Sequence, residues 1–382
     1  MKQIALIIGA ICFFITGQSQ DIIKARKILD TLTSPYFWGR GYTNNGMQKA
    51  AGFIAAEFKS YGLQSFITKG FLQEFTYPVN TFPGKMEVSV NGKVLQPGID
   101  FIIGPESVGK KGVGVLMEQD SVNSIDREKK IIVSLENKLT WKASVKTEDY
   151  TLIQINKKSI TEKPKTITLN IENKFIRAFR AANVCGYVQG TAHPDSFIVI
   201  TAHYDHLGGM GSGTYFPGAN DNASGVALLL ALANHYAALP ASYSVAFIAF
   251  GGEEAGLEGS KYFSENPLFP LKKIRFLINL DLIGTGEEGI TSVNATVFKE
   301  EFALLNEIND REKYLVKIKP RGKAANSDHY WFTEKGVPSF FIYAMGGIQA
   351  YHDVYDRAAT LPLTEFEDLF RLLVEFNKGL ME

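Results

Sequence analysis

The chain has 382 residues, of which 45% are hydrophobic and 21% are charged. This composition is typical of a globular protein with a large buried core. Lys plus Arg and Asp plus Glu number 40 each, so the formal net charge is zero. A balanced charge gives no electrostatic basis for binding nucleic acid or an anionic membrane surface, and we expect neither partner.

The N-terminal segment differs from the rest of the chain. Met1-Lys-Gln is a short basic start, residues 4–15 are almost wholly apolar, and residues 16–21 are small and polar. This is the layout of a secretory signal peptide, and the apolar run is short for a membrane span. We predict a signal peptide at 1–20 and a periplasmic or extracellular mature protein without stable membrane association. An uncleaved anchor is the alternative.

Cysteine usage agrees with a protein that has no disulfide framework. After the predicted cleavage only Cys185 remains, so no intramolecular disulfide can form and no disulfide-linked partner is expected. Cys185 lies in a strand-like apolar run, which favours a buried, inert thiol.

Two kinds of segment follow in chain order. Residues 21–63 show helical spacing. The helix predicted from Met47 to Tyr61 is followed by Gly62, whose residue type predicts a C-terminal cap. Residues 86–178 alternate in hydrophobicity and contain the hairpin signal Asn91-Gly92. Lysines are frequent there, which favours a solvated face over an acidic partner. We predict a β-rich insertion or accessory domain at 86–178.

From residue 183 onward, strand and helix patterns alternate. The predicted strands are 197–202, 244–250, 274–281 and 337–343, and the predicted helices are 223–238, 255–264, 299–309 and 363–380. Near-continuous apolar strands separated by helices predict an α/β fold with a mixed, largely parallel central sheet covered by helices on both faces. Residues 21–85 and 179–382 would form this catalytic domain.

Acidic and histidine residues follow the ends of these strands. They are His203, Asp205, Asp221, Glu253, Glu254, Asp281 and His352. Singly, each has an ordinary explanation: Asp221 could be only a helix N-cap, and the paired glutamates only a solvated turn. Together they point to one edge, because ligand sites in open α/β sheets gather at the carboxyl ends of strands. Histidines with carboxylates suit zinc, with manganese or cobalt as other possible metals.

The motifs in this half resemble those of a known family. They are Thr201-Ala-His-Tyr-Asp-His, Gly218-Ala-Asn-Asp-Asn-Ala-Ser-Gly, Phe250-Gly-Gly-Glu-Glu-Ala-Gly-Leu-Glu-Gly-Ser, Asn279-Leu-Asp-Leu-Ile-Gly, Ser327-Asp-His and Tyr351-His-Asp-Val-Tyr-Asp. The chain resembles the co-catalytic dizinc aminopeptidase family, which includes secreted bacterial aminopeptidases, glutamate carboxypeptidase-like enzymes and glutaminyl cyclases. The motifs span residues 183–360, and the 86–178 region has no counterpart that we can assign.

The resemblance implies two zinc ions per chain. His203 and Asp281 would bind one ion, Glu254 and His352 would bind the other, and Asp221 would bridge them. Two metals of this kind activate a water molecule between them for attack on a scissile carbonyl group.

The resemblance also implies three residues with other roles. Glu253 would be the general base and then return the proton to the leaving amine. Asp205 would hydrogen-bond the ring of His203 and orient it. Tyr351 would help to stabilise the oxyanion. Two further histidines, His206 and His329, are left outside the predicted metal shell.

The predicted function is that of a secreted dinuclear-zinc exopeptidase, an aminopeptidase that removes N-terminal residues from peptides. Glutaminyl-peptide cyclisation and carboxypeptidase-type hydrolysis on the same fold are alternatives, and a non-catalytic binding protein is a third. Related cyclases use one zinc, and the block at 218–226 resembles the peptidases more. No Gly-x-Ser-x-Gly nucleophile motif is present, and the glycine-rich stretch 208–213 lacks the lysine of a phosphate loop, which predicts a flexible rim.

Overall fold

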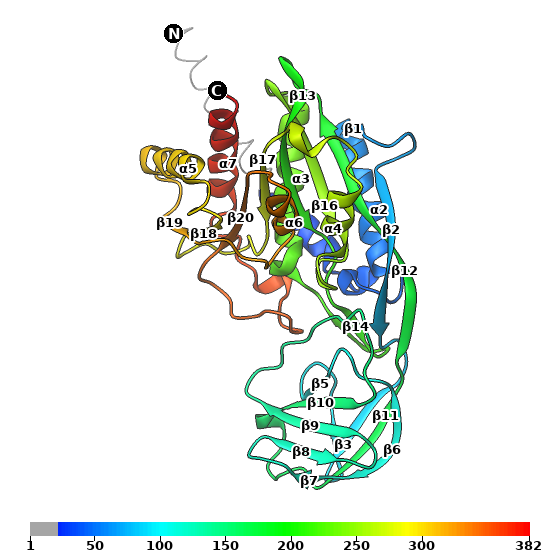
Figure 1. Cartoon of the computed structure of the whole chain (residues 1–382). Coiled ribbons are helices and arrows are strands. Elements are labelled where there is room, and N and C mark those ends of the chain that lie inside the picture. Colours follow the sequence, from blue (N-terminus) through cyan, green and yellow to red (C-terminus); the bar gives the residue numbers. More distant parts are fainter. Residues whose placement is uncertain (1–21) are drawn as a thin grey trace, which may run out of the picture.

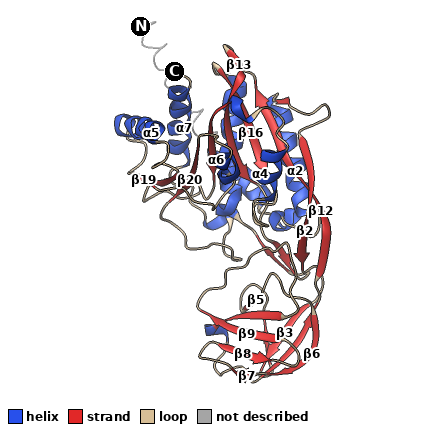
Figure 2. Cartoon of the chain, in the orientation of Figure 1, coloured by secondary structure: helices blue, strands red, loops and turns tan. Residues whose placement is uncertain are grey.

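The structure, a computed structural model, describes residues 22–382, so the predicted signal peptide lies outside the described residues. A central sheet with helices on both faces forms the main body, and a smaller β-rich unit is attached at one end (Figures 1 and 2). This architecture confirms the predicted fold class. Within residues 22–382, no helix combines the length and the apolar character needed to cross a bilayer.

The central sheet has nine strands in the order β1-β12-β16-β13-β17-β20-β18-β19, and β2 also pairs with β12. Its four middle strands, β16, β13, β17 and β20, run parallel, while β12 and β18 flank them in antiparallel orientation. The strand bounds are β1 (Gln64–Ser65), β2 (Leu72–Thr81), β12 (Lys174–Val188), β13 (His193–His203), β16 (Tyr243–Phe250), β17 (Ile274–Leu280), β18 (Ile290–Val293), β19 (Ile318–Pro320) and β20 (Ser339–Ala344).

The two faces of the sheet pack into separate cores because successive strand residues point to opposite sides. On β13, Ile198 and Ile200 enter the larger core, and Val199 enters the smaller one. Residues 22–32 form a helix on the larger side. The other helices on that side are α2 (Gly46–Tyr61), α3 (Gly225–Ala238), α5 (Lys299–Glu312) and α7 (Phe366–Leu380); α4 (Glu258–Glu265) and α6 (His329–Glu334) cover the smaller core. Short helical turns are η1 (Pro35–Arg40), η2 (Lys157–Ser159), η3 (Ala219–Ser224), η4 (Leu271–Lys273) and η5 (Ala358–Thr360).

The insertion, residues 86–171, has two small sheets and a hydrophobic core of its own. One sheet has the order β5-β10-β9-β8-β7 and the other β4-β3-β11-β6. Their bounds are β3 (Met86–Val90), β4 (Lys93–Leu95), β5 (Phe101–Ile103), β6 (Lys110–Val115), β7 (Met117–Glu118), β8 (Asn123–Asp126), β9 (Ile131–Glu136), β10 (Thr151–Asn156) and β11 (Thr166–Ile171). The strand β12 crosses the predicted boundary at 178, because it pairs with β2 from Lys174 to Val184 and connects both units.

The glycine-rich stretch 208–213, which was predicted to be a flexible rim, contains regular β structure. Its first three residues form β14 (Gly208–Met210), which pairs in a hairpin with the following strand β15 (Thr214–Phe216). Met210 and Phe216 are buried in the core of the insertion, so the hairpin joins the two units. Glycine is needed here for close packing, because a Cβ on Gly41 would lie 2.4 Å from the Cα of Gly208.

Candidate metal centre

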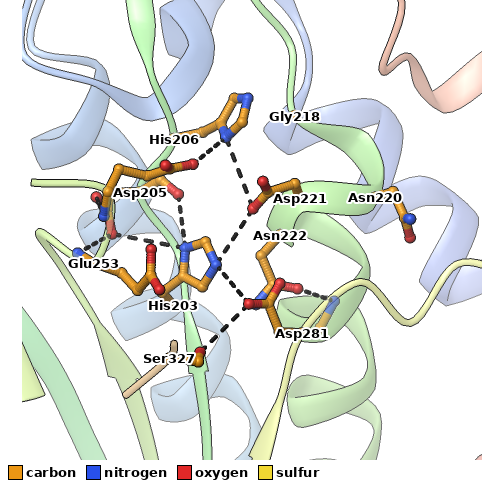
Figure 3. Close-up of polar contacts among 12 residues, drawn as sticks. His203, Asp205, His206, Gly218, Asn220, Asp221, Asn222, Glu253, Asp281 and Ser327 are labelled. Atoms are coloured by element: carbon orange, nitrogen blue, oxygen red, sulfur yellow. Dashed lines mark hydrogen bonds and ion pairs between the residues drawn. The ribbon is translucent and has the colours of Figure 1, made fainter. Parts of the chain in front are cut away.

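The parallel strands bring the predicted ligands to one edge of the sheet. β13 ends at His203, which pairs in register with Phe250 at the end of β16. Glu253 and Glu254 follow β16, and Asp281 follows β17. Figure 3 shows the side chains of His203, Glu253 and Asp281, which come from separate elements, converging on one space.

The first group of contacts surrounds His203, whose side chain is 1% exposed. Its Nε2 atom lies 3.4 Å from Asp221 Oδ1 and 3.4 Å from Asp281 Oδ2 (Figure 3). Ser327 supports Asp281 by donating its hydroxyl to Oδ2 at 3.4 Å, and Asn279 in turn donates to Ser327 at 2.8 Å. One histidine nitrogen and two carboxylates are therefore held together in a buried place.

The second group surrounds His352. Its Nε2 atom lies 3.0 Å from Asp221 Oδ2 and 3.2 Å from Glu254 Oε2. The two oxygens of Asp221 therefore face different histidines, Oδ1 toward His203 and Oδ2 toward His352. This placement gives Asp221 the geometry that a residue bridging two adjacent ions requires.

His206, which the sequence analysis left outside the predicted metal shell, lies within the cluster. Its Nδ1 atom is 2.7 Å from Glu254 Oε1. The same atom is 3.9 Å from Asp221 Oδ1 (Figure 3). His206 thus contacts one oxygen of Glu254 and leaves Oε2 facing His352. The signal that could have found it is its position three residues after His203, the last residue of β13. The other extra histidine, His329, is buried against Phe341 outside this cluster, and burial lowers its pKa to about 4.

Glu253 lies beside the first group. His203, Glu253 and Asp281 offer ligand atoms within 4.8 Å of one another, and His206, Asp221 and Glu254 form a second such set. Burial raises the pKa of Glu253 well above its ordinary value, and the negative charges of Asp328 and Glu254 raise it further. A carboxylate with a raised pKa, open to a cavity, is suited to accept and return a proton.

The carboxylate of Asp205 makes contacts other than the predicted hydrogen bond to the ring of His203. Its Oδ1 and Oδ2 atoms accept the backbone N–H groups of Glu253 at 3.1 Å and Glu254 at 3.3 Å. The ring of His203 instead has its Nδ1 atom 3.2 Å from the backbone carbonyl of Asp205, and 3.9 Å from Oδ1. The prediction of a carboxylate-to-ring hydrogen bond was wrong, because the carboxylate reaches across to the turn after β16. It fixes the two glutamates, and burial raises its own pKa to about 7.

Asp221 lies in η3, an irregular turn that precedes α3, and its peptide bond to Asn222 is cis. The carboxylate of Asp356 holds this turn by accepting the N–H groups of Asn220 at 2.8 Å and Asp221 at 3.0 Å. Sequence reasoning assigned no role to Asp356, although it closes the motif that begins at Tyr351.

Arg40 is fully buried beneath the same turn, and sequence reasoning missed it. Its guanidinium donates to the carbonyls of Pro217 and Gly218, both at 2.7 Å, and to that of Asp221 at 3.2 Å. It also donates to Tyr204 at 2.8 Å. Burial lowers the pKa of Arg40 to about 10, so the group stays charged at neutral pH and partly offsets the carboxylates above it.

The insertion touches the metal centre directly through Trp141. The Nδ1 atom of His352 lies 2.9 Å from the Trp141 carbonyl, and the Trp141 N–H donates to the His352 carbonyl at 2.9 Å. A carbonyl acceptor on Nδ1 leaves Nε2 as the metal-binding nitrogen. Tyr351 is 43% exposed, and its ring stacks on that of His352 with centroids 4.0 Å apart.

The residues fit one or two divalent cations with nitrogen and oxygen ligands. Buried carboxylates so close together need compensating positive charge. Asp281 Oδ1 has no hydrogen-bond partner among the described residues, which leaves a lone-pair position that a metal could satisfy. A cavity of about 460 Å³ opens onto the cluster, and Tyr351 contributes to its wall.

A cluster of histidines and carboxylates at the strand ends of such a sheet defines the class of metal-dependent hydrolases. The sequence profile of peptidase family M28 matches residues 183–377, and the chain belongs to this family. This confirms the resemblance drawn from the motifs.

Curated relatives match part of the chain. Aminopeptidase YwaD of Bacillus subtilis (strain 168) is 33% identical over 150 residues, which cover 38% of this chain and 31% of that protein. A probable zinc metalloprotease of Pyricularia oryzae is 35% identical over 114 residues, 29% of this chain and 23% of that protein. The matched regions therefore span less than a third of either relative.

Solved structures match the fold of nearly the whole chain. A peptidase M28 precursor from Shewanella amazonensis SB2B has a TM-score of 0.70 at 16% identity and covers 96% of both chains. The zinc aminopeptidase BSAP from Bacillus subtilis has a TM-score of 0.69 at 17% identity, covering 93% of this chain and 94% of that one. Coverage this high includes most of the 86–178 region, to which the sequence motifs assigned no counterpart.

Proposed function

We propose that the chain is a dinuclear zinc aminopeptidase that removes N-terminal residues from peptides. The observation that supports it best is the geometry of Asp221, whose two oxygens face two separate histidine–carboxylate pairs. Family membership and the similarity to the two aminopeptidases described above support the same activity.

In this proposal, His203 and Asp281 would hold one zinc ion, Glu254 and His352 would hold the other, and Asp221 would contact both. Asp205 and His206 position Glu254 through its backbone N–H and its second oxygen. Mixed histidine and carboxylate donors are ordinary zinc ligands, and they carry enough negative charge for two divalent cations.

Zinc bound here would supply Lewis acidity, which polarises a carbonyl group and lowers the pKa of water. Glu253 accepts the proton of the attacking water and delivers it to the leaving amine. Tyr351 lies on the cavity wall beside His352, where its hydroxyl can donate to the oxyanion. Burial raises the pKa of this phenol, so it remains a donor across the working pH range.

We also propose that the protein is exported. The support is the sequence of residues 1–20, with a basic start, an apolar run and a small polar end. Export would place the active site in the periplasm or outside the cell, where peptides are its substrates.

The test is metal analysis of the purified mature protein, combined with an assay on leucine and other aminoacyl anilides with and without a chelator. We expect two zinc ions per chain and chelator-sensitive release of the aniline. One zinc ion with no anilide turnover would contradict the proposal and favour glutaminyl cyclisation, which N-terminal glutaminyl peptides would then reveal.

A further inference from the structure

We propose that Lys142 and Arg321 form a carboxylate-binding site in the substrate cavity, so that the preferred substrates carry an acidic group near the scissile bond. The inference rests on the proposed peptidase function and adds a substrate class to it. Both side chains line the cavity of about 460 Å³ that contains Glu253 and the predicted metal ligands.

Charge is the first argument for this site. The acidic residues that line the cavity are Asp221, Glu253, Glu254 and Asp281. Two divalent cations would offset those four carboxylates. The wall is then left with the positive charges of Lys142 and Arg321, and a cavity with this balance favours an anionic group on the substrate.

Pairing is the second argument. Lys138 and Lys146, which flank Lys142 in sequence, form ion pairs with Asp353 at 3.6 Å and with Glu148 at 3.0 Å. Within residues 22–382, Lys142 has no such carboxylate partner, although it faces the cavity. An exposed ammonium group beside a substrate cavity is available to a ligand.

Among the described residues, Arg321 likewise lacks a carboxylate partner such as the one that a nearby basic residue, Lys323, has. Lys323 forms an ion pair with Glu334. Arg321 donates Nη1 to the hydroxyl of Tyr343 at 3.3 Å, and has no carboxylate partner in the described part of the chain. Its backbone N–H is fixed to the Ser292 carbonyl at 2.9 Å, so the base of the side chain is held at the end of β19. The remaining guanidinium donors suit a carboxylate, which they can bind in a bidentate manner.

The position of Lys142 is fixed by the contacts of Trp141. That residue is 5% exposed and donates Nε1 to the Ile103 carbonyl at 2.8 Å. Its backbone N–H donates to the His352 carbonyl, and its own carbonyl lies against Nδ1 of the His352 ring, both at 2.9 Å. The backbone that carries Lys142 is therefore anchored next to a predicted metal ligand. Through this segment the insertion supplies part of the substrate wall.

The carboxylate can come from two sources, an acidic side chain or the free C-terminus of a short peptide. Two substrate pairs separate them: aspartyl anilide against asparaginyl anilide, and Leu-Leu against Leu-Leu amide. In one of the two pairs, we expect kcat/KM for the substrate with the carboxylate to exceed that of its uncharged partner about tenfold or more. A factor of this size corresponds to the free energy of one charge-assisted hydrogen bond. The difference should lie mainly in KM.

The variants Lys142→Ala and Arg321→Ala should reduce that ratio toward one, and Lys142→Glu should reverse it. Lys146→Ala is the matched control, an exposed lysine of the same segment with carboxylate partners of its own, and should keep the ratio. Calorimetry with the Glu253→Gln protein gives a second measurement without turnover, in which Leu-Leu and Leu-Leu amide should differ in Kd as they do in KM if the C-terminus is the source.

Equal kcat/KM within both pairs would overturn the inference while the peptidase function stands. A ratio that persists in both alanine variants would overturn it as well. Absence of hydrolysis of every anilide and peptide would instead contradict the proposed function, so the two failures are distinguishable.

Discussion

Charged residues are used in opposite ways at the edge of the central sheet and in the insertion. At the sheet edge, the side chains of His203, Asp221 and Glu254 are at most 5% exposed and lie close together. In the insertion, ion pairs such as Lys130 with Asp149 are 55% and 84% exposed. Exposed pairs contribute little to stability, whereas buried carboxylates are costly unless positive charge compensates them. The difference separates a site built for chemistry from a surface built for solubility.

The largest effect should follow from changing the proposed base at the sheet edge. Glu253→Gln keeps the size of the side chain but cannot accept a proton. We expect turnover of leucine anilide to fall by about a hundred- to ten-thousand-fold, with two zinc ions retained. The control is Glu258→Gln, a nearby glutamate on α4 that does not line the cavity. Turnover close to that of the wild type, with full metal content, would rule out this role for Glu253.

The second-largest effect should follow from replacing Arg40, which is buried beneath the turn that carries Asp221. Arg40→Met removes a buried donor from the carbonyls of Pro217, Gly218 and Asp221, which are left without their charged partner. We expect the free energy of unfolding in urea to fall by about 3–5 kcal/mol. Arg127→Met, at an exposed site in the insertion, should change it little. Equal unfolding midpoints for the two variants would show that Arg40 does not hold the Asp221 turn.

A third experiment asks whether the insertion contributes to the metal centre. Trp141→Ala removes the indole donor to Ile103 and the ring packed against Phe216 at 4.6 Å, so the carbonyl that orients His352 is less firmly placed. We expect zinc affinity, measured by competition with a chelating dye, to fall about ten- to hundredfold. Val133→Ala removes volume from the core of the insertion at β9 and should leave zinc affinity unchanged. An equal loss in both variants would indicate general loosening instead.

The smallest effect concerns a carboxylate that acts only within the insertion. Asp126 accepts the N–H groups of Lys129 at 2.9 Å and Val115 at 3.0 Å, and the first of these lowers its pKa below the ordinary 3.8. A pKa that is lower in the folded state means that the ionised group stabilises the fold above about pH 4 and loses this effect as the pH falls through the folded value. Asp126→Asn should therefore reduce stability slightly at pH 7 and less at low pH.

Unfolding in urea at both pH values, with chelator present throughout, measures that difference without a contribution from metal release. The same variant should bind zinc as the wild type does. If Asp126→Asn lowered the free energy of unfolding equally at both pH values, ionisation of Asp126 would not be the cause of the loss.

The sequence alone determined the central strands and the position of most acidic and histidine residues. Apolar runs such as 197–202 and 244–250 are buried on both sides, so their composition indicates strands directly. Because parallel strands end at a common edge, the residues after them, His203, Glu253 and Asp281, were predictable as neighbours. The short strands β18 and β19 at one side of the sheet were not, since three or four residues carry too little periodicity.

Only the tertiary structure decided which atoms these residues contact. Asp205 binds the turn after β16, and Arg40 binds a turn more than 170 residues away in sequence. Trp141 meets His352 although the two lie 211 residues apart. Local patterns report which face of a strand or helix is buried, because burial depends on the residue and its period. A hydrogen-bond partner depends on where a distant backbone passes, and no local pattern in either segment records that position.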